Sequence, residues 1–403
     1  MKSFRAGSAF GIPIELDLTF LLVLPVFAYL IGLQLGELVP LLNGTLGFGL
    51  DAGALTATAS IRYAIGAVAA LGLFVCVVAH EFGHSLVARQ YGVPIESITL
   101  WLLGGVARME EIPEDWRKEF AIAIAGPVVS VGVGLLTYVG FLLTPTGGSV
   151  LGAARFTLAY LAVMNVVLAA FNLLPGFPMD GGRILRALLA RSRPHAKATQ
   201  QAARVGQTFA IVLGVVGLVA GFNVLLIALA FFIYIAAASE STRTAMRAAF
   251  EGVTVRDVMT PREELDIIDP TVSVADLVDR MFRERHTGYP VLDGDQVVGV
   301  VTLSDAREVD EIERDARRVE DVMSRELHTV TPETPVMDAF ETMQENGVGR
   351  LLVMADDGRL VGLLSRTDVM TALEIVKSGG DPSRRPVAGG ETAGAEVLER
   401  DRA

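Results

Sequence analysis

The chain has 403 residues, of which 51% are hydrophobic, and its mean hydropathy of +0.47 is above that of most soluble domains. Residues 1–239 have a net charge of +2, whereas residues 240–403 have a net charge of −14, so the acidity of the chain lies in its second part. This distribution excludes one uniform soluble domain and a nucleic-acid-binding protein with a basic face, and the single cysteine excludes an intrachain disulfide framework.

Long stretches without a charged side chain predict membrane-spanning helices in the first part of the chain. A bilayer core takes about 20 apolar residues as a helix, and four stretches of suitable length precede residue 180. A fifth stretch, residues 205–239, would be about 52 Å long as one helix, far beyond a core of about 30 Å. We therefore expect two short spans there, joined at residues 221–223, with one long tilted helix as the alternative. The four earlier stretches are residues 18–36, 63–79, 120–143 and 156–179.

The positions of Lys and Arg alternate along the chain as six spans require. Basic residues precede the first stretch, are absent from residues 37–60, and recur after the second, fourth and last stretches, while only Arg155 lies between the third and fourth. Because loops rich in Lys and Arg stay in the cytoplasm, we expect both termini to be cytoplasmic and the protein to lie in the plasma membrane. The expected fold of residues 1–240 is an all-α polytopic domain of about six transmembrane helices.

The second stretch ends in His80-Glu81-Phe82-Gly83-His84. Residues four apart lie on one face of a helix, so the two imidazoles can share one metal ion with the carboxylate of Glu81 beside them. The alternative is a chance match of five residues. Ionisable side chains are costly inside a membrane and usually mark function, which favours the metal site.

The fourth stretch ends in a segment that cannot continue as a regular helix. It reads Asn172-Leu-Leu-Pro-Gly-Phe-Pro-Met-Asp180 and is followed by two glycines. Irregular backbone at membrane depth is tolerated where it lines a cavity. A catalytic zinc ion takes three protein ligands and leaves a fourth position open, and Asp180 is the candidate for the third. The alternative is an ordinary helix end, at which Asp180 caps the next helix.

These two segments resemble the motifs of the site-2 protease family of intramembrane zinc proteases. The family motifs His-Glu-x-x-His and Asn-x-x-Pro-x-x-Pro-x-Asp-Gly both occur in full, in the expected order and on the expected spans, and the resemblance covers roughly residues 10–240. It implies a metalloendopeptidase in which His80, His84 and Asp180 hold one Zn²⁺ ion per chain.

The resemblance also implies how the protein acts. Glu81 would take the proton of the attacking water and pass it to the leaving amine. Asn172 would donate to the carbonyl oxygen as it becomes anionic, with a packing amide within the helix as its alternative role. The substrate would be a transmembrane helix, unwound before attack. Residues 101–109, which include Gly104 and Gly105, would offer an edge strand that holds it extended, with a re-entrant packing loop as the alternative.

The acidic part of the chain is an internal repeat with an offset of 63–64 residues. Val-Arg-Asp-Val-Met ends at residue 259 and recurs as Val-Glu-Asp-Val-Met at 323. Each copy predicts a short helix, an amphipathic helix and two strands. We expect the amphipathic helices at residues 274–284 and 336–346, and the strands at 288–292, 297–302, 349–354 and 360–365. The repeat resembles a pair of α/β CBS domains, about 250–310 and 315–377 within residues 241–377. In that family a Ser or Thr and an Asp contact the ribose and phosphate of ATP, ADP or AMP. The corresponding residues here are Thr302, Asp305, Ser365 and Asp368.

Several further expectations follow for the whole protein. The leading one is intramembrane proteolysis of membrane-protein substrates, modulated by adenine nucleotide at the CBS pair, with no nucleic acid as a partner. The alternatives are a CBS-regulated membrane transporter or channel, and an inactive relative that acts as a scaffold. A homodimer through the CBS domains is also expected, as is a disordered tail over residues 378–403.

Overall fold

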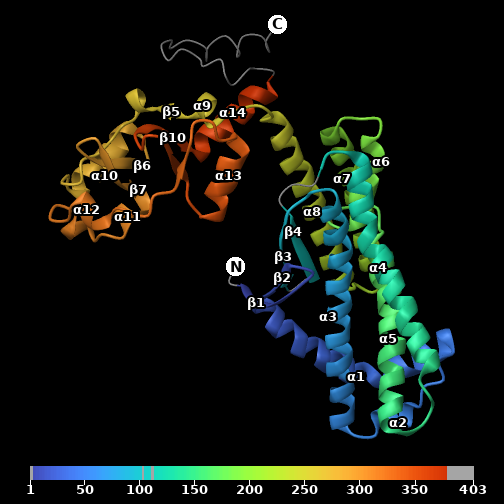
Figure 1. The fold of residues 1–403 in the computed structure, drawn as a ribbon. Coiled ribbons are helices and arrows are strands. Elements are labelled where there is room, and N and C mark those ends of the chain that lie inside the picture. Colours follow the sequence, from blue (N-terminus) through green and yellow to red (C-terminus); the bar gives the residue numbers. More distant parts are fainter. Residues whose placement is uncertain (1–2, 102–103, 110–112, 379–403) are drawn as a thin grey trace. The chain divides into compact units, whose positions relative to one another are not determined.

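The computed structural model describes residues 3–101, 104–109 and 113–378, and Figure 1 shows its elements in chain order. The chain divides into two compact units, Met1–Thr244 and Ala245–Ala403. The expected tail falls outside the described residues from 379 onward. The first unit is built on long apolar helices, and the second is a mixture of short helices and strands.

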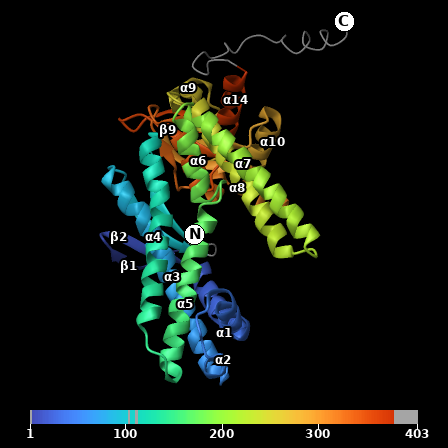
Figure 2. The same cartoon turned by 90° about the vertical axis from the view of Figure 1, so that its right-hand side faces the viewer.

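Six helices of the described residues are long and apolar enough to cross a membrane, as the sequence predicts. The hairpin expected at residues 221–223 is present, and Figure 2 shows its two helices, α7 and α8, side by side. The single long helix considered for that region is therefore wrong. Two short helices, α2 (Ala52–Thr56) and α6 (Asp180–Ala190), lie between spans. The six are α1 (Leu18–Leu46), α3 (Ala59–Gln90), α4 (Trp116–Leu143), α5 (Gly148–Asn172), α7 (His195–Val219) and α8 (Val224–Ala249).

The first unit also contains a four-stranded sheet, which the expectation of an all-α membrane domain leaves out. Its strand order is β1-β2-β3-β4, with β2 and β3 parallel and the outer pairs antiparallel. The alternation of apolar residues in β1 and β2 is too short to distinguish these strands by sequence from an irregular polar segment. The strands are β1 (Ser3–Ala9), β2 (Ile12–Asp17), β3 (Ile95–Trp101) and β4 (Gly104–Met109).

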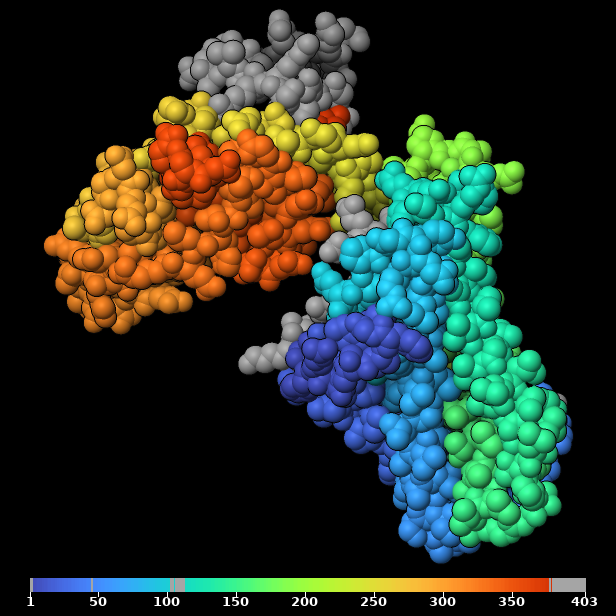
Figure 3. Space-filling model, viewed as in Figure 1, coloured from blue at the N-terminus to red at the C-terminus, as the bar shows by residue number. Residues whose placement is uncertain are grey.

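The sheet packs on the part of α3 that carries the His-Glu-x-x-His motif. Ile12 of β2 and Ile98 of β3 bury their side chains against Phe82 of α3, and in the space-filling view the dark blue N-terminal strands lie directly on this helix (Figure 3). β4 is one of the two edge strands of the described sheet, and β1 is the other. The edge strand expected within residues 101–109 is therefore present in its described part.

The second unit follows the predicted repeat closely. The helices α10 (Val274–Glu284) and α13 (Val336–Glu345) are the two amphipathic helices expected from the sequence, and α9 (Val255–Val258) and α12 (Val319–Val322) are the short ones that precede them. The remaining helices are α11 (Leu303–Arg307) and α14 (Arg366–Lys377), with the 3-10 turns Arg262–Glu264 and Glu311–Glu313.

The first part of each repeat pairs with the sheet of the other. β5, which follows α9 of the first repeat, pairs with β10 of the second. Ser324, which follows α12 of the second repeat, forms an isolated bridge to Val300 in β7 of the first. These pairings join the two repeats into one module. Its strands are β5 (Thr260–Pro261), β6 (Gly288–Asp293), β7 (Gln296–Thr302), β8 (Thr329–Val330), β9 (Arg350–Met354) and β10 (Leu360–Ser365).

Candidate metal centre

The two histidines of the motif lie on one buried face of α3. His80 and His84 are each 3% exposed, and their Nε2 atoms are 3.2 Å apart. The spacing of four residues brings the imidazoles to the same side of the helix. The sequence prediction that these two side chains can share one ion therefore agrees with the geometry.

The third candidate ligand approaches them from a different part of the chain. The prolines of the segment 173–179 end α5 and keep the backbone irregular up to α6, whose first residue is Asp180. The carboxylate atom Oδ2 of Asp180 lies 3.2 Å from Nε2 of both histidines. Met179, not Asp180, occupies the N-cap position of α6, so the alternative role of Asp180 as a helix cap is wrong.

The three donor atoms fit a zinc ion by their chemistry and by their mutual distances. Two imidazole nitrogens and one carboxylate oxygen form a common catalytic zinc set. Ligand atoms at about 2.0–2.1 Å from a tetrahedral ion are about 3.3 Å from one another, close to the 3.2 Å between each pair here. All three side chains are buried, and they form one of the groups of possible metal ligands among the described residues.

Two contacts from α4 orient the imidazoles. Nδ1 of His84 donates to the backbone carbonyl of Ile122 at 2.7 Å, and Nδ1 of His80 lies 2.8 Å from the hydroxyl of Ser130. A carbonyl oxygen can only accept, so Nδ1 of His84 carries the proton and its Nε2 offers a lone pair. The sequence analysis missed Ser130 and Ile122, because nothing in their spacing from α3 indicates the contacts.

Two glycines, one in α4 and one in β4, allow the backbone to approach the motif closely. A Cβ atom added to Gly126 of α4 would lie 2.2 Å from Nε2 of His84 and 2.7 Å from Nε2 of His80. A Cβ atom added to Gly105 of β4 would lie 2.6 Å from Cγ of Glu81. The expected substrate strand is therefore in van der Waals contact with the expected general base, and Gly104 is paired with Trp101 at the end of the same hairpin.

The amide of Asn172 is bound within its own helix. Its Nδ2 donates to the carbonyl of Leu168 at 3.0 Å, so the structure shows it in the packing role that was the alternative to transition-state stabilisation. Asn165 makes the same kind of bond to Leu161 at 2.8 Å and is completely buried. Its Oδ1 accepts no hydrogen bond from any described residue.

A second group of possible ligands, Asp266, Glu284 and His286, occurs in the second unit, but its members already have hydrogen-bond or ion-pair partners. Asp266 pairs with His286 at 3.0 Å, and Glu284 accepts from Arg280 at 2.9 Å and from the hydroxyl of Tyr289 at 2.8 Å. Burial opposes ionisation of Glu284, yet the hydrogen bonds from Tyr289 and Arg280 lower its pKa. The group is half-exposed, and these pairings explain it without a metal.

The predicted nucleotide-binding residues open the helices that follow β7 and β10. Oδ2 of Asp305 accepts from the amide and hydroxyl of Thr302, both at 2.7 Å, and Oδ2 of Asp368 accepts from the amide and hydroxyl of Ser365 at 2.8 and 2.7 Å. A cavity of about 660 Å³ includes Thr302 and Asp305 and is lined by both repeats. Its basic side chains are Arg307, His328 and Arg350.

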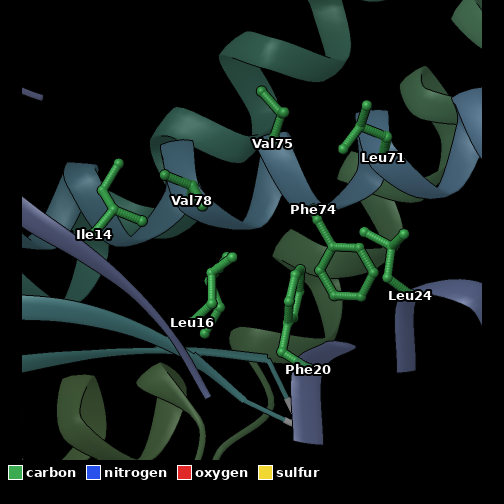
Figure 4. A pocket seen from close by; sticks show the side chains of 9 residues that line it. Ile14, Leu16, Phe20, Leu24, Leu71, Phe74, Val75 and Val78 are labelled. Carbon is green, nitrogen blue, oxygen red and sulfur yellow. The ribbon is translucent and has the colours of Figure 1, made fainter. Parts of the chain in front are cut away.

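Another cavity, of about 290 Å³, lies in the first unit and has an entirely apolar lining. Figure 4 shows side chains of α3 such as Val78 facing Leu16 of β2, with Phe20 of α1 against Phe74. The two rings meet edge to face at 4.5 Å. The described residues that line this cavity are all apolar, so they offer no catalytic side chain.

Models of two families match the chain. "Peptidase family M50" matches residues 68–150 and 147–213, and "CBS domain" matches residues 255–311 and 319–375. A zinc metalloprotease of Methanocaldococcus jannaschii is 34% identical over 378 residues, which cover 93% of this chain and 97% of that protein. Rip3 of Mycobacterium tuberculosis is 34% identical over 331 residues, covering 79% and 83%.

Solved structures give similar matches. A site-2 protease from Methanocaldococcus jannaschii is 36% identical, covers 60% of this chain and 95% of its own, and has a TM-score of 0.40. The CBS-pair protein CBSX2, solved in complex with AMP, is 32% identical, covers 31% of this chain and 98% of its own, and has a TM-score of 0.28.

Proposed function

Because the chain belongs to peptidase family M50, the site-2 protease family of zinc metalloproteases, and carries a CBS pair, we propose that it hydrolyses peptide bonds in or near transmembrane helices of other membrane proteins. The observation that carries this proposal is the convergence of His80, His84 and Asp180 in a part of the chain with six apolar helices long enough to cross a membrane. Family membership favours proteolysis over the alternative of a transporter or channel. We assign the protease to residues 1–240 and the CBS pair to residues 241–377.

His80, His84 and Asp180 would hold the zinc ion. Zn²⁺ bound there would supply a Lewis acid that polarises the scissile carbonyl and acidifies a water molecule. Glu81 lies one residue after His80 on α3, with its side chain against Gly105. In this position it would accept the proton of the attacking water and return it to the amine of the leaving peptide.

The outer edge of β4 would hold the substrate. An edge strand presents N–H and C=O groups on one side, and an extended peptide can pair with them. Because Gly105 lies against Glu81, a peptide paired with β4 would lie near the proposed general base. A transmembrane helix must give up its own hydrogen bonds before it can pair in this way, so unwinding precedes attack.

Asn172 would stabilise the oxyanion only after a change of partner. Its amide group now donates to Leu168, and a developing negative charge is a stronger acceptor than a neutral carbonyl. Rotation of the side chain away from its helix would then accompany the rise of charge on the substrate. We therefore propose that Asn172 stabilises the oxyanion, but only once the substrate is bound.

The distribution of Lys and Arg supports a membrane topology with both termini and the CBS pair in the cytoplasm. Arg62 departs from the pattern, because it lies in the first turn of α3 on the side that we assign to the exterior. Its guanidinium donates to the carbonyls of Gly32 and Leu33 in α1, at 3.3 and 3.2 Å. This structural role accounts for a cation at that position.

The CBS pair would adjust proteolysis by binding an adenine nucleotide. The cavity beside Thr302 and Asp305 is large enough for a mononucleotide and carries basic side chains that suit phosphate. Oδ2 of Asp305 is used to cap α11, so ribose would be bound by the other oxygen of this carboxylate. A homodimer through the CBS domains stays a prediction.

The test of proteolysis is the variant Glu81→Gln of the full chain, co-expressed with a tagged single-span membrane protein. We expect the zinc content to be retained and cleavage to fall by about 10²–10⁴, the usual contribution of a positioned acid–base group. His80→Ala, which removes a ligand, should lose zinc as well. Cleavage by Glu81→Gln at the wild-type rate would refute the assignment.

A further inference from the structure

Arg186 of α6 is a buried cation that the proposed chemistry does not use. It is 4% exposed, and its Nε lies 2.5 Å from Oε1 of Glu119 in α4, which is itself 1% exposed. Its NH1 group lies 2.7 Å from Oε1 of Glu240 in α8. Charges are buried in this way only when they are paired, and removal of one partner is strongly destabilising. The arrangement therefore fixes α6 to two membrane-spanning helices at once.

The same side chain also touches the segment that leads to the metal centre. The guanidinium lies over the ring of Phe177, 5.1 Å from its centroid. Phe177 is buried against small residues of α7 and against Ala237 of α8. Glu240 follows Ala237 by three residues and so lies on the same face of α8. One face of α8 thus contacts both Arg186 and Phe177, the residues that flank Asp180.

Helix α8 is also the element that enters the CBS unit. It runs without interruption from Val224 to Ala249. Its last residues, Met246 and Ala249, pack with Phe250 in the hydrophobic core of the second CBS repeat. A displacement of α8 moves Ala237 and Glu240 together, because both belong to this one helix.

We propose that Arg186 is a positioning residue, through which α8 sets the place of Asp180 in the metal centre. The anchor on one side is Glu119, which belongs to α4, the helix whose Ser130 and Ile122 also hold the two histidines. On its other side Arg186 is paired with Glu240, which belongs to α8 and would be displaced with that helix. Arg186 and Asp180 belong to one short helix of 11 residues, so a shift of Arg186 shifts the carboxylate with it. The proposal rests on the proposed function only in assigning a metal to Asp180.

The decisive variant is Glu240→Gln, made in the full chain. Glu240 is partly exposed and its loss leaves the pair of Arg186 and Glu119 intact, so the fold is retained. The zinc dissociation constant is measured by competition with a chromophoric chelator, and cleavage is measured on the same preparations. We expect zinc affinity and kcat to fall by about 2–30-fold, the range typical of residues that couple sites without touching a ligand, with KM unchanged.

Two further variants make the test specific. Arg186→Lys keeps a cation, but an ammonium group cannot bind Glu119 and Glu240 with the geometry of the planar guanidinium. We therefore expect a larger loss of zinc affinity than for Glu240→Gln. Arg191→Gln removes an exposed cation at the end of the same helix and should bind zinc as the wild type does. Unchanged zinc affinity in both Glu240→Gln and Arg186→Lys, or an equal loss in Arg191→Gln, would overturn the proposal.

The zinc measurement separates this proposal from the proposed function. If Glu81→Gln cleaves normally, the proteolytic assignment fails, while the effect of Glu240→Gln on zinc affinity still supports positioning of Asp180. If Glu81→Gln is inactive but Glu240→Gln has wild-type affinity and kcat, the proteolytic assignment stands and the role of Arg186 is refuted.

Discussion

A single methyl group at Gly126 should destroy the metal centre. In Gly126→Ala the new Cβ would lie 2.2 Å from Nε2 of His84, 2.6 Å from its Cε1 and 2.7 Å from Nε2 of His80. Non-bonded heavy atoms are at their optimum at about 3.5 Å or more, so an imidazole or α4 must move by about 1 Å. The rings cannot turn freely, because Ser130 and Ile122 hold their other nitrogens. The strain therefore falls on the atoms that bind the metal.

The magnitude follows from what smaller disturbances of metal ligands do. Loss of one partner that orients a ligand costs about 10–100-fold in metal affinity, and displacement of both imidazoles should cost at least about 100-fold. The assay is elemental analysis of the zinc-to-protein ratio, followed by chelator competition. Gly132→Ala is the matched control, since it lies in the same helix and its new Cβ would meet no atom within 4 Å. Wild-type zinc affinity in Gly126→Ala would refute the geometry of the centre.

Three other predictions concern the contact of Ser130 with the proposed zinc ligand His80, the membrane topology and the CBS pair. Ser130→Ala should weaken zinc binding by about 10–100-fold in the same competition assay, and an unchanged affinity would show that the hydroxyl does not orient His80. Cysteines introduced into residues 37–60 should label from outside the cell, and those in residues 250–370 only after permeabilisation; labelling of the latter in intact cells would contradict an even number of spans. Calorimetry on residues 241–377 should detect binding of ATP, ADP or AMP, and Asp305→Ala and Asp368→Ala should weaken this binding. The nucleotide should also change the rate of cleavage by the full chain, by a factor of about 5–150. No heat together with a flat cleavage response would leave the CBS pair a structural module.

The helices and the CBS elements could be predicted because their signals are local. Apolar length gives the spans, and the limit on the length of one helix gives the break near residues 221–223. The amphipathic helix at Val274–Glu284 and the strand at Leu360–Ser365 coincide with their predicted bounds, because a helical period and a run of β-branched and aliphatic residues are both complete within one element.

The sheet of the first unit and the surroundings of the metal could not be predicted in the same way. β2 pairs in parallel with β3, so that Ile14 lies beside Ile98, and no local pattern in the sequence indicates such a distant partner. Ser130 is 50 residues from His80, and Glu119 is 67 residues from Arg186. In the sequence analysis, Arg186 counts only as one of the basic residues that indicate membrane topology, although its side chain is buried.

Gly105 gives a test that separates the general base from the metal. A Cβ at this position would lie 2.6 Å from Cγ of Glu81 and 3.3 Å from its carboxyl carbon. Glu81 is a flexible side chain, so Gly105→Ala can be accommodated by moving the carboxylate. The three atoms nearest to the new Cβ all belong to Glu81, and none belongs to His80, His84 or Asp180. We expect kcat to fall by about 10²-fold, the cost of a misplaced catalytic group, with zinc affinity unchanged. Gly126→Ala should lose zinc, and Gly105→Ala should keep zinc and lose rate. Equal loss of zinc in both variants would mean that β4 and α4 support the ligands alike, and that Glu81 is not held separately by the edge strand.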